Sequence, residues 1–418
     1  MPRRSLRIAW IGSGPGTQES GGAPGVATEL MLGLAGLGHQ IDCYLSGRER
    51  EIPDRLARAD GVTFYWGTGE WRWGSWYNRT ALGSFVSGLV TRGLGSLRVR
   101  RSLRDRHAVN PYDVIFQFNS IEALAVPRSL RHSLPLVIDA GTHSKGELRH
   151  LLAERSLALQ CQPAPVFALT VGVMWLRVLV QRRLIRAARL LVCISTVFRD
   201  HLVRDYRVPL ENTVVIPNPV RLERFAAADL TRALGAPPTV LVLGRISARK
   251  GIEDVIAMAR RLHDRGIDAR VRVVGGPSLW SDYTELLSDL PPENSEFAGR
   301  IAPAKIPEEL ARADVLVQAS TYEPFGLTVG EALAAGVLVA ATSEVGAIEN
   351  VDRAVVAEMA PGDVEGLTSA VVELLARLAQ DAPGVRAKAR AEAERLFAPD
   401  VVCRQVSDAL LALVVSAV

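Results

Sequence analysis

Short apolar runs alternate with amphipathic stretches through most of this 418-residue sequence. The runs are rich in β-branched residues and are bounded by Gly, Pro or Asp, a pattern typical of buried strands. It predicts strands at 6–11, 41–45, 114–118, 135–138, 190–194 and 214–216. Between them, apolar residues at helical spacing predict helices at 26–37 and 121–131. Strands that alternate with helices favour a parallel sheet covered by helices.

The same alternation restarts after Pro217-Asn218-Pro219, and prolines interrupt both patterns near 217–224, where we place a hinge. The second set of expected strands lies at 239–243, 271–274, 315–318 and 337–341, with helices near 251–265, 305–312 and 328–335. The sequence therefore predicts an α/β protein with two Rossmann-like doubly wound domains that face a cleft. We expect an N-terminal domain at 1–218, a C-terminal domain at 219–396, and a helix at 397–418 that returns to the first domain.

Charge differs between the two halves of the chain. Residues 1–220 carry 28 Lys and Arg against 17 Asp and Glu, a net charge of +11, whereas residues 221–418 carry 21 against 28, a net charge of −7. A basic half is suited to nucleic acid, an anionic membrane or a phosphorylated substrate. The four cysteines are scattered without a C-x-x-C pair, which argues against a disulfide scaffold or zinc ribbon and fits a reducing, cytoplasmic compartment.

One stretch, residues 64–106, departs from the alternation. It holds four of the seven tryptophans at 66–76 and six arginines at 92–106, namely Trp66, Trp71, Trp73, Trp76, Arg92, Arg98, Arg100, Arg101, Arg104 and Arg106. Two interpretations stay open: an inserted helical hairpin with solvated arginines, or a surface that contacts anionic lipid or an acceptor. The run 165–190 is also apolar and then basic, and a buried helix with an exposed basic end is the favoured interpretation there.

Candidate chemistry begins at residues 320–336, STYEPFGLTVGEALAAG, which follow a predicted strand, pass a Pro/Gly turn and enter a helix. We expect the backbone N–H groups around Phe325, Gly326 and Leu327 at the carboxyl end of that strand. Open α/β sheets bind ligands there, and a helix N-terminus favours phosphate. Glu323 on the turn and Glu331 in the first helical turn can accept sugar hydroxyls. The alternative is structural, because Thr328-x-x-Glu331 is also a capping box.

A second cluster lies in LVLGRISARKG, residues 241–251. The strand ends at Gly244, and Arg245 and Lys250 precede a helix that opens at Gly251. A potentially bidentate guanidinium and a compact ammonium suit a diphosphate leaving group. An exposed basic loop is the alternative interpretation.

With both motifs in place, the chain resembles the retaining GT-B glycosyltransferases of the glycosyl transferases group 1 class over nearly its whole length. The class signature, two glutamates separated by seven residues, is matched by Glu323 and Glu331 inside EPFGLTVGEALAAG. The class motif LGR…KG is matched by Gly244, Arg245, Lys250 and Gly251. Further similarities are a Gly-Gly loop at Gly21-Gly22, VGGP at 274–277, ISTV at 194–197 and the interdomain Pro217-Asn218.

The resemblance implies transfer of a hexose from a UDP- or GDP-sugar to a hydroxyl acceptor with retention of configuration. Cell-envelope glycan, glycolipid and secondary-metabolite synthesis are the implied settings. Arg245, Lys250 and Glu323 would be catalytic. Donor contacts would come from Gly21, Gly22, Gly244, Gly275, Phe325, Gly326, Leu327 and Glu331. On the acceptor side, Asp139 and His143 would orient the hydroxyl. The class usually works without a bound metal, so we expect no metal site and no cofactor apart from the substrate.

The expected partners are a nucleotide-sugar donor and a small-molecule, glycan or lipid-linked acceptor, without nucleic acid. Peripheral contact with the inner face of an anionic membrane is a further expectation. Two other functions were weighed. The EPFG…E pattern disfavours a GT-B sugar-nucleotide epimerase. The intact set of Glu323, Glu331, Arg245 and Lys250 disfavours a non-catalytic, membrane-associated GT-B scaffold.

Overall fold

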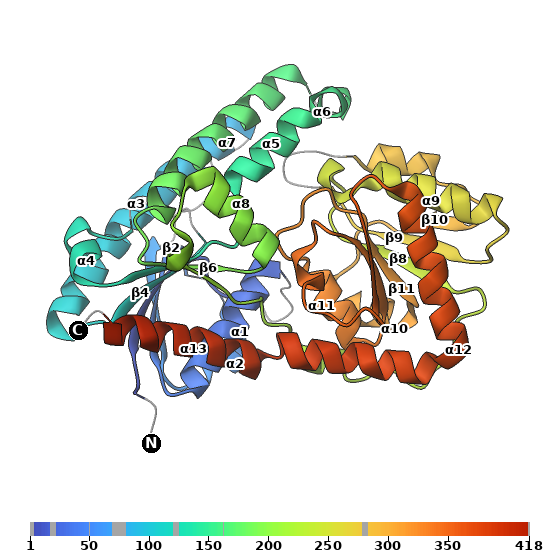
Figure 1. Ribbon diagram of the computed structural model, residues 1–418. Coiled ribbons are helices and arrows are strands. Elements are labelled where there is room, and N and C mark those ends of the chain that lie inside the picture. Colours follow the sequence, from blue (N-terminus) through green and yellow to red (C-terminus); the bar gives the residue numbers. More distant parts are fainter. Residues whose placement is uncertain are drawn as a thin grey trace.

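A computed structural model describes residues 4–16, 22–49, 51–68, 81–119, 125–161, 163–277 and 283–416. It shows two α/β domains side by side, with two helices at the end of the chain running along both (Figure 1). Each domain is built on one sheet, and every pair of neighbouring strands in both sheets is parallel.

The N-terminal sheet has seven strands in the order β3-β2-β1-β4-β5-β6-β7. These strands are β1 (Arg7–Gly12), β2 (Gln40–Arg48), β3 (Val62–Thr68), β4 (Val114–Phe118), β5 (Leu136–Asp139), β6 (Leu190–Cys193) and β7 (Thr213–Val215). Every residue of β4 and β5 is buried, because helices cover both faces of the central strands. This burial explains why these strands read as continuous apolar runs instead of alternating ones.

Helices of the N-terminal domain divide between the two faces of its sheet. They are α1 (Gly22–Gly36), α2 (Asp54–Ala57), α3 (Ala81–Val109), α4 (Arg128–Ser133), α5 (Ser144–Ala153), α6 (Arg155–Cys161), α7 (Ala164–Ile185) and α8 (Thr196–Tyr206). Leu30 of α1 shares one core cluster with Ile8 of β1. Leu103 of α3, Leu184 of α7 and Phe198 of α8 share the other cluster with Ile11. Thus α3, α7 and α8 cover the face opposite α1.

The C-terminal sheet has six strands in the order β10-β9-β8-β11-β12-β13. Its strands are β8 (Thr239–Leu243), β9 (Arg270–Val274), β10 (Ser295–Phe297), β11 (Val315–Gln318), β12 (Leu338–Thr342) and β13 (Val356–Met359). Its helices are α9 (Ile252–Asp264), α10 (Ile306–Arg312), α11 (Leu327–Ala334) and α12 (Val364–Phe397). Buried Asp314 fixes the start of β11, because it accepts from Arg386 at 2.6 Å, from Arg232 at 2.8 Å and from the Thr239 N–H at 2.8 Å.

The last helix, α13 (Pro399–Ser416), lies on the N-terminal domain. It packs against α1, where a Cβ added at Gly33 would lie 2.3 Å from the Cys403 sulfur. His39 Nε2 and Ser407 Oγ, 2.7 Å apart, link the same helix to the loop before β2. The chain therefore crosses between the domains twice, once after β7 and once between α12 and α13.

The predicted fold class, two doubly wound domains, is confirmed. The hairpin expected at 64–106 is wrong in its first part, because 64–68 belong to β3, which pairs with β2. Trp66 is half-buried there and its ring lies 6.4 Å from that of Phe64. Trp71, Trp73 and Trp76 lie outside the described residues. Of the helix expected at 121–131, residues 125–127 are not helical and α4 begins at Arg128, whereas residues 121–124 lie outside the described residues.

The favoured interpretation of residues 165–190 is wrong for one side of the helix. Six side chains of α7 are buried, among them Phe167, Leu184 and Ile185, but the outer side exposes Trp175, Leu176 and other apolar residues. By length and composition, α7 is the one helix of the described chain that is long and apolar enough to cross a membrane. Only 22% of its most apolar 18-residue segment is buried.

Candidate active site

The turn between β11 and α11 lies at the carboxyl edge of the C-terminal sheet and carries Glu323. Backbone hydrogen bonds hold this turn from two sides. Thr321 N donates to Arg249 O at 2.9 Å, and Glu323 N donates to Glu344 O at 3.1 Å. Gly346 N in turn donates to Glu323 O at 3.2 Å. The loops that follow β8 and β12 thus fix the backbone of Glu323.

Two cations converge on the Glu323 carboxylate. Arg249 Nη1 lies 3.1 Å from Oε2, and Lys250 Nζ donates to the same oxygen. Burial alone would raise the pKa of Glu323, but the Lys250 ammonium and the Arg249 guanidinium outweigh it and lower that pKa to about 2. Glu323 therefore stays ionised at neutral pH, within a cluster that holds one more cation than anion.

The structure brings Lys250 and Glu323, both predicted from the motifs, into contact, and it adds Arg249, which the motifs did not single out. Arg249 also donates to the carbonyl of Tyr322 at 2.8 Å, so it supports the turn as well as its carboxylate. Its position next to Lys250 in the run Ala-Arg-Lys was the available signal. Arg245, the other predicted cation, is exposed on the same loop.

Close backbone approaches at the carboxyl edge require glycine at two predicted positions. A Cβ at Gly275, after β9, would lie 1.8 Å from Gly244 O, after β8. A Cβ at Gly251 would lie 2.0 Å from Ala319 O, and Gly251 adopts φ +66°. Real Cβ atoms do not approach oxygen this closely, so glycine allows the three loops to meet at one point. These glycines place Lys250 beside the turn that carries Glu323.

The capping-box interpretation of Thr328 and Glu331 is wrong. The helix α11 begins at Leu327 after Gly326, whose φ is +94°, and no described side chain caps it. Glu331 therefore lies in the second helical turn, and the Thr328 hydroxyl accepts from Gln318 Nε2 instead. Without a side-chain cap, the positive end of α11 stays available to a ligand.

Glu331 is mostly buried, with 13% of its side chain exposed, and its Oε1 lies 3.8 Å from Arg224 Nη1. Burial raises the pKa of Glu331 to about 7, and Arg224 offsets only part of this effect. Glu323 and Glu331 thus have opposite electrostatic surroundings: the first is held ionised by two cations, and the second titrates near neutrality. Glu323 can therefore accept a hydrogen bond from a hydroxyl group at neutral pH, and Glu331 can either accept or donate one.

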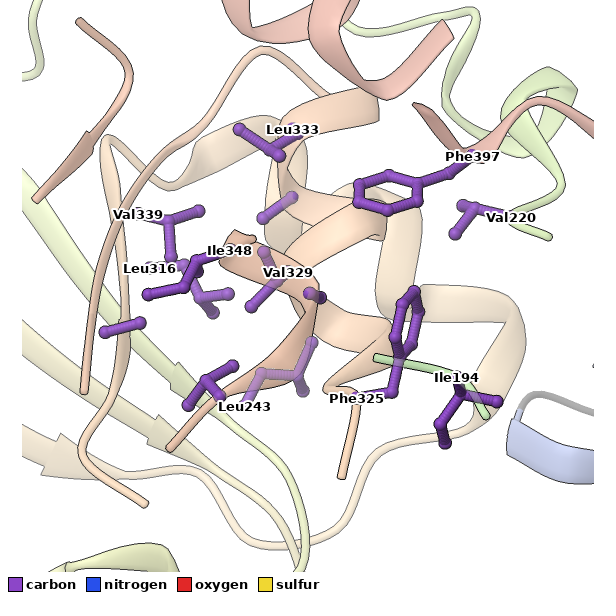
Figure 2. Packing of buried hydrophobic residues seen from close by; sticks show 14 of the residues in the cluster. Ile194, Val220, Leu243, Leu316, Phe325, Val329, Leu333, Val339, Ile348 and Phe397 are labelled. Carbon is purple, nitrogen blue, oxygen red and sulfur yellow. The ribbon is translucent and has the colours of Figure 1, made fainter. Parts of the chain in front are cut away.

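Apolar packing holds α11 in place. Figure 2 shows Phe325 between Phe397 and Ile194, with Val220 beside Phe397. The rings of Phe325 and Phe397 meet edge to face, with centroids 5.6 Å apart. Since the Phe325 side chain is buried in this core, only its backbone can serve the predicted donor contact. The half-buried Leu327, which follows Gly326, packs against the same core.

The carboxyl edges of the two sheets meet at the start of α8. Ser195 caps this helix by accepting from Phe198 N at 3.1 Å, and its hydroxyl donates to Pro324 O at 2.7 Å. The Glu349 carboxylate accepts from the N–H groups of Thr196 and Val197, both at 2.7 Å. The C-terminal domain thus supplies the anion that a helix N-terminus favours. This contact explains the ISTV motif at 194–197 in structural terms.

Of the two predicted acceptor-side residues, His143 lies in the same domain interface. It is fully buried, with Nδ1 2.8 Å from the Tyr322 hydroxyl and Nε2 3.2 Å from Asp205 Oδ2. Burial lowers the pKa of His143 to about 3, against the opposing effect of Asp205, so the ring is neutral at pH 7. The structure brings His143 next to the residue that precedes Glu323.

Asp139 ends β5 at the carboxyl edge of the N-terminal sheet and is 3% exposed. Its Oδ1 is buried and has no hydrogen-bond partner in the described part of the chain. Burial raises the pKa of Asp139 to about 7, although a backbone N–H from Gly141 opposes the shift. A buried carboxyl oxygen without a partner favours the protonated acid or an incoming hydroxyl.

Of the predicted Gly-Gly loop, only Gly22 is described, and Gly21 lies outside the described residues. Gly22 adopts φ +65° at the start of α1, and an added Cβ there would meet nothing within 4 Å. Among the residues that the structure describes, no group of three His, Cys, Asp or Glu side chains could hold a metal ion.

Two doubly wound sheets whose carboxyl edges meet beside a cation–carboxylate cluster are the arrangement expected of a GT-B glycosyltransferase. Comparison with known families agrees: residues 237–377 match Glycosyl transferases group 1, and residues 20–224 match Glycosyltransferase Family 4. The two matches together cover most of the chain. The chain belongs to the glycosyl transferases group 1 class of GT-B proteins.

Curated relatives align over different parts of the chain. Mannosylfructose-phosphate synthase from Agrobacterium fabrum is 29% identical over 36% of this chain, and glycogen synthase from Mycobacterium tuberculosis is 30% identical over 52%. The chain spans 37% and 52% of the lengths of these two relatives. A D-inositol 3-phosphate glycosyltransferase from Kineococcus radiotolerans is 28% identical over 79% of this chain and 74% of its own length.

Two solved structures share the fold along the whole chain. Sucrose-phosphate synthase from Thermosynechococcus elongatus superposes with a TM-score of 0.69 at 20% identity, covering 98% of this chain and all of that chain. Anabaena HepE in complex with UDP and glucose gives a TM-score of 0.62 at 18% identity, covering 97% of this chain and all of that chain.

The raised pKa of Glu331 predicts a pH-dependent stability. The unfolded chain ionises this carboxyl near 4.5 and the folded chain only near 7, so the folded state binds more protons between these values. Stability should fall as pH rises from 4.5 to 7, by up to about 3 kcal/mol for this group. Urea unfolding of Glu331→Gln between pH 4.5 and 8 should lack this component. An unchanged slope in Glu331→Gln would contradict the shifted pKa.

Proposed function

We propose that this protein transfers a hexose from a UDP- or GDP-sugar to a hydroxyl acceptor with retention of configuration. The proposal rests above all on one observation: Lys250 and Arg249 converge on Glu323 at the carboxyl edge of the C-terminal sheet. Open α/β sheets bind their ligands at this edge. The setting that we propose is synthesis of a cell-envelope glycan, a glycolipid or a secondary metabolite.

The electrostatics of the cluster suit the leaving group of such a reaction. As the glycosidic bond breaks, negative charge develops on the nucleotide diphosphate and positive charge on the sugar. Lys250 and the exposed Arg245 can stabilise the diphosphate, and the uncapped start of α11 adds its N–H groups. Glu323, kept ionised by its cations, can accept hydroxyl hydrogens of the sugar. Backbone at Gly244 and Gly275 would line the nucleotide, and Glu331 would contact its ribose.

We also propose that transfer needs no divalent metal. The side chains Lys250, Arg249 and Arg245 already place positive charge on one loop, at residues 245–250. In enzymes that use a metal for the same step, the ion neutralises the diphosphate. Transfer that survives saturating EDTA would support the proposal, and a complete loss that Mn²⁺ restores would contradict it.

The comparisons support the choice of donor class. One solved structure of the same fold is described as a complex with UDP and glucose, and the curated relatives include glycogen synthase and D-inositol 3-phosphate glycosyltransferase. The first title names a nucleotide and a hexose, and the other two names are those of a glycogen synthase and a glycosyltransferase. They extend to this chain as a proposal only, because the shared fold does not determine the substrate.

On the acceptor side, we propose that Asp139 orients the acceptor hydroxyl. The buried Oδ1 needs a hydrogen-bond partner, and its place at the end of β5 faces the same domain junction as Glu323. His143 has a different part in the proposal. Through the Tyr322 hydroxyl it positions the turn that carries Glu323, and it acts on the acceptor only indirectly.

Replacing the central cation should slow transfer without unfolding the domain. Lys250→Met keeps the apolar stem but removes the charge, and we expect turnover to fall by about 10²–10³-fold, the usual effect of losing one donor to developing charge. Nucleotide release from UDP- or GDP-sugars measures this, with thermal unfolding as the check on folding. Lys250→Arg should restore part of the lost rate.

Arg260 provides the matched control. It is exposed on α9 and donates to the Asp289 carbonyl at 2.8 Å. Arg260→Met also removes one cation from the acidic C-terminal domain. Turnover should change less than about twofold, because salt screens the charge of an exposed side chain. Equal rates in Lys250→Met and Arg260→Met would refute the role given to Lys250.

Asp139→Asn should separate the acceptor side from the donor side. The amide replaces one carboxyl oxygen with an NH₂ group, which can no longer accept the hydrogen bond of the acceptor hydroxyl, so transfer to the acceptor should fall at least about tenfold. Affinity for the nucleotide, measured by calorimetry, should stay unchanged because Asp139 belongs to the other sheet. Loss of nucleotide binding, or a covalent glycosyl group trapped on Asp139 in the wild-type protein, would contradict this assignment.

A further inference from the structure

The outer side of α7 is an exposed apolar stripe. Thirteen large apolar side chains are exposed in the described part of the chain, and five of them lie on this helix: Val166 (45%), Leu169 (40%), Trp175 (58%), Leu176 (51%) and Leu179 (43%). Their spacing is helical: Val166 and Leu169 are three residues apart, as are Leu176 and Leu179, Trp175 and Leu179 are four apart, and Leu169 and Leu176 are seven apart. A contiguous apolar face on a folded chain marks a contact with another surface.

The inner side of α7 is fixed in the fold. Gln181 is fully buried, accepts from Ser144 N at 2.7 Å and from the Tyr206 hydroxyl at 2.6 Å, and donates to Thr142 O at 2.6 Å. The helix also connects β5 to β6, two neighbouring strands of one sheet. Hence α7 cannot leave the domain to cross a membrane, although its length and composition would allow it. Only its outer face can meet a partner.

The same face becomes cationic in its last turns. Arg182, Arg183 and Arg186 are exposed and continue the spacing of Trp175, Leu176 and Leu179. Between Glu154 and Asp200 the sequence contains no acidic residue. An apolar stripe that includes a tryptophan and ends in arginines has the composition of helices that lie in a membrane interface. The stripe contains no carboxylate, so if two copies of the chain met through this face, neither would offer a partner to the arginines of the other.

Helix α3 repeats this arrangement on the same side of the sheet. Leu94 and Leu97 are 54% and 50% exposed, and the exposed arginines Arg98, Arg101 and Arg104 follow them at helical spacing. Both helices lead from the carboxyl edge of the parallel sheet back to its amino edge, so their apolar and basic parts run in the same order. Figure 1 shows α3 and α7 on the side opposite α1 and α13.

An open pocket of about 730 Å³ adjoins the basic part of α3. The wall of this pocket includes Asp105 and four arginines, namely Arg7, Arg98, Arg101 and Arg106. Asp105 pairs with Arg101 at 3.7 Å and with Arg104 at 3.4 Å, so it offsets only part of the positive charge. Such a pocket is suited to anionic groups such as lipid phosphates.

We propose that the outer faces of α7 and α3 form a docking surface for an anionic lipid bilayer, with α7 lying in the plane of the interface. The apolar stripe would enter the boundary between headgroups and acyl chains, and the arginines would bind anionic headgroups. This surface shares Arg98, Arg101 and Arg104 with the stretch 64–106 that the sequence singles out, and it adds the apolar stripe of α7. It relies on a helix that connects strands of the N-terminal sheet.

Membrane docking through α7 also indicates the class of acceptor, an inference that rests on the proposed function. Helix α5 begins directly after His143 at the carboxyl edge and packs along α7, and α6 joins the two. In Figure 1 the α6 end of this unit lies on the side of the C-terminal domain. A membrane against α7 would therefore lie near the junction of the two domains. A lipid-linked hydroxyl acceptor is the class that such a geometry serves.

Flotation of the full chain with vesicles tests the docking surface. We expect binding to vesicles of equal parts phosphatidylcholine and phosphatidylglycerol, and much weaker binding to phosphatidylcholine alone. Arg182→Gln with Arg183→Gln should weaken anionic-vesicle binding about 30-fold at low salt, since each arginine contributes about 1 kcal/mol near such a surface. Trp175→Ser with Leu176→Ser should weaken it at least about tenfold, because both apolar side chains leave the interface.

Leu210→Ser is the matched control, because Leu210 is 55% exposed but lies on the loop before β7. It should bind vesicles as the wild type does, and all variants should keep the same nucleotide affinity. Wild-type binding by both α7 variants, or no binding of the wild type to anionic vesicles, would overturn the proposal. So would a dimer in light scattering that Trp175→Ser with Leu176→Ser dissociates. None of these outcomes depends on transferase activity, so the proposed function is tested separately.

Discussion

The position of the turn at 319–326 is the constraint on which the rest of the site depends. Backbone hydrogen bonds tie it to the loop after β8 and to the loop after β12, and the Ser195 hydroxyl ties it to the other domain through Pro324 O at 2.7 Å. A carboxylate at position 323 can remain nearly buried only because Lys250 and Arg249 reach it from a neighbouring strand. The parallel sheet brings these strand ends together, and glycines at 251 and 275 allow the final approach.

The same turn joins the two domains. Tyr322, one residue before Glu323, contacts His143 of the N-terminal domain, and Glu349 accepts from the start of α8. Because these contacts lie beside the cation cluster, the distance between the donor side and the acceptor side is set by the residues that also shape the donor site. A change in domain arrangement would therefore alter Glu323 and the acceptor side together. This coupling is suited to a reaction in which two substrates must meet at one carbon.

The sequence predicted the sheets well because parallel strands buried on both faces are continuous apolar runs, as in β4 and β5. It overlooked β3 at the sheet edge, where exposed and half-buried residues mix, and it misread α7, whose apolar outer face cannot be distinguished from a buried one by composition. Motifs identified Glu323 and Lys250, since both follow strands. They could not identify Arg249 as a partner of Glu323 or Tyr322 as a partner of His143, because those contacts depend on how three loops and two domains come together.

If the cation cluster around Glu323 binds the diphosphate of a nucleotide sugar, a crystal structure of the full chain with UDP or GDP will show it. We expect diphosphate oxygens within hydrogen-bond distance of Lys250 Nζ, at about 2.7–3.2 Å, with the nucleotide along the carboxyl edge of the C-terminal sheet. A nucleotide bound elsewhere, with Lys250 still paired to Glu323 and without contact to phosphate, would refute this role of the cluster.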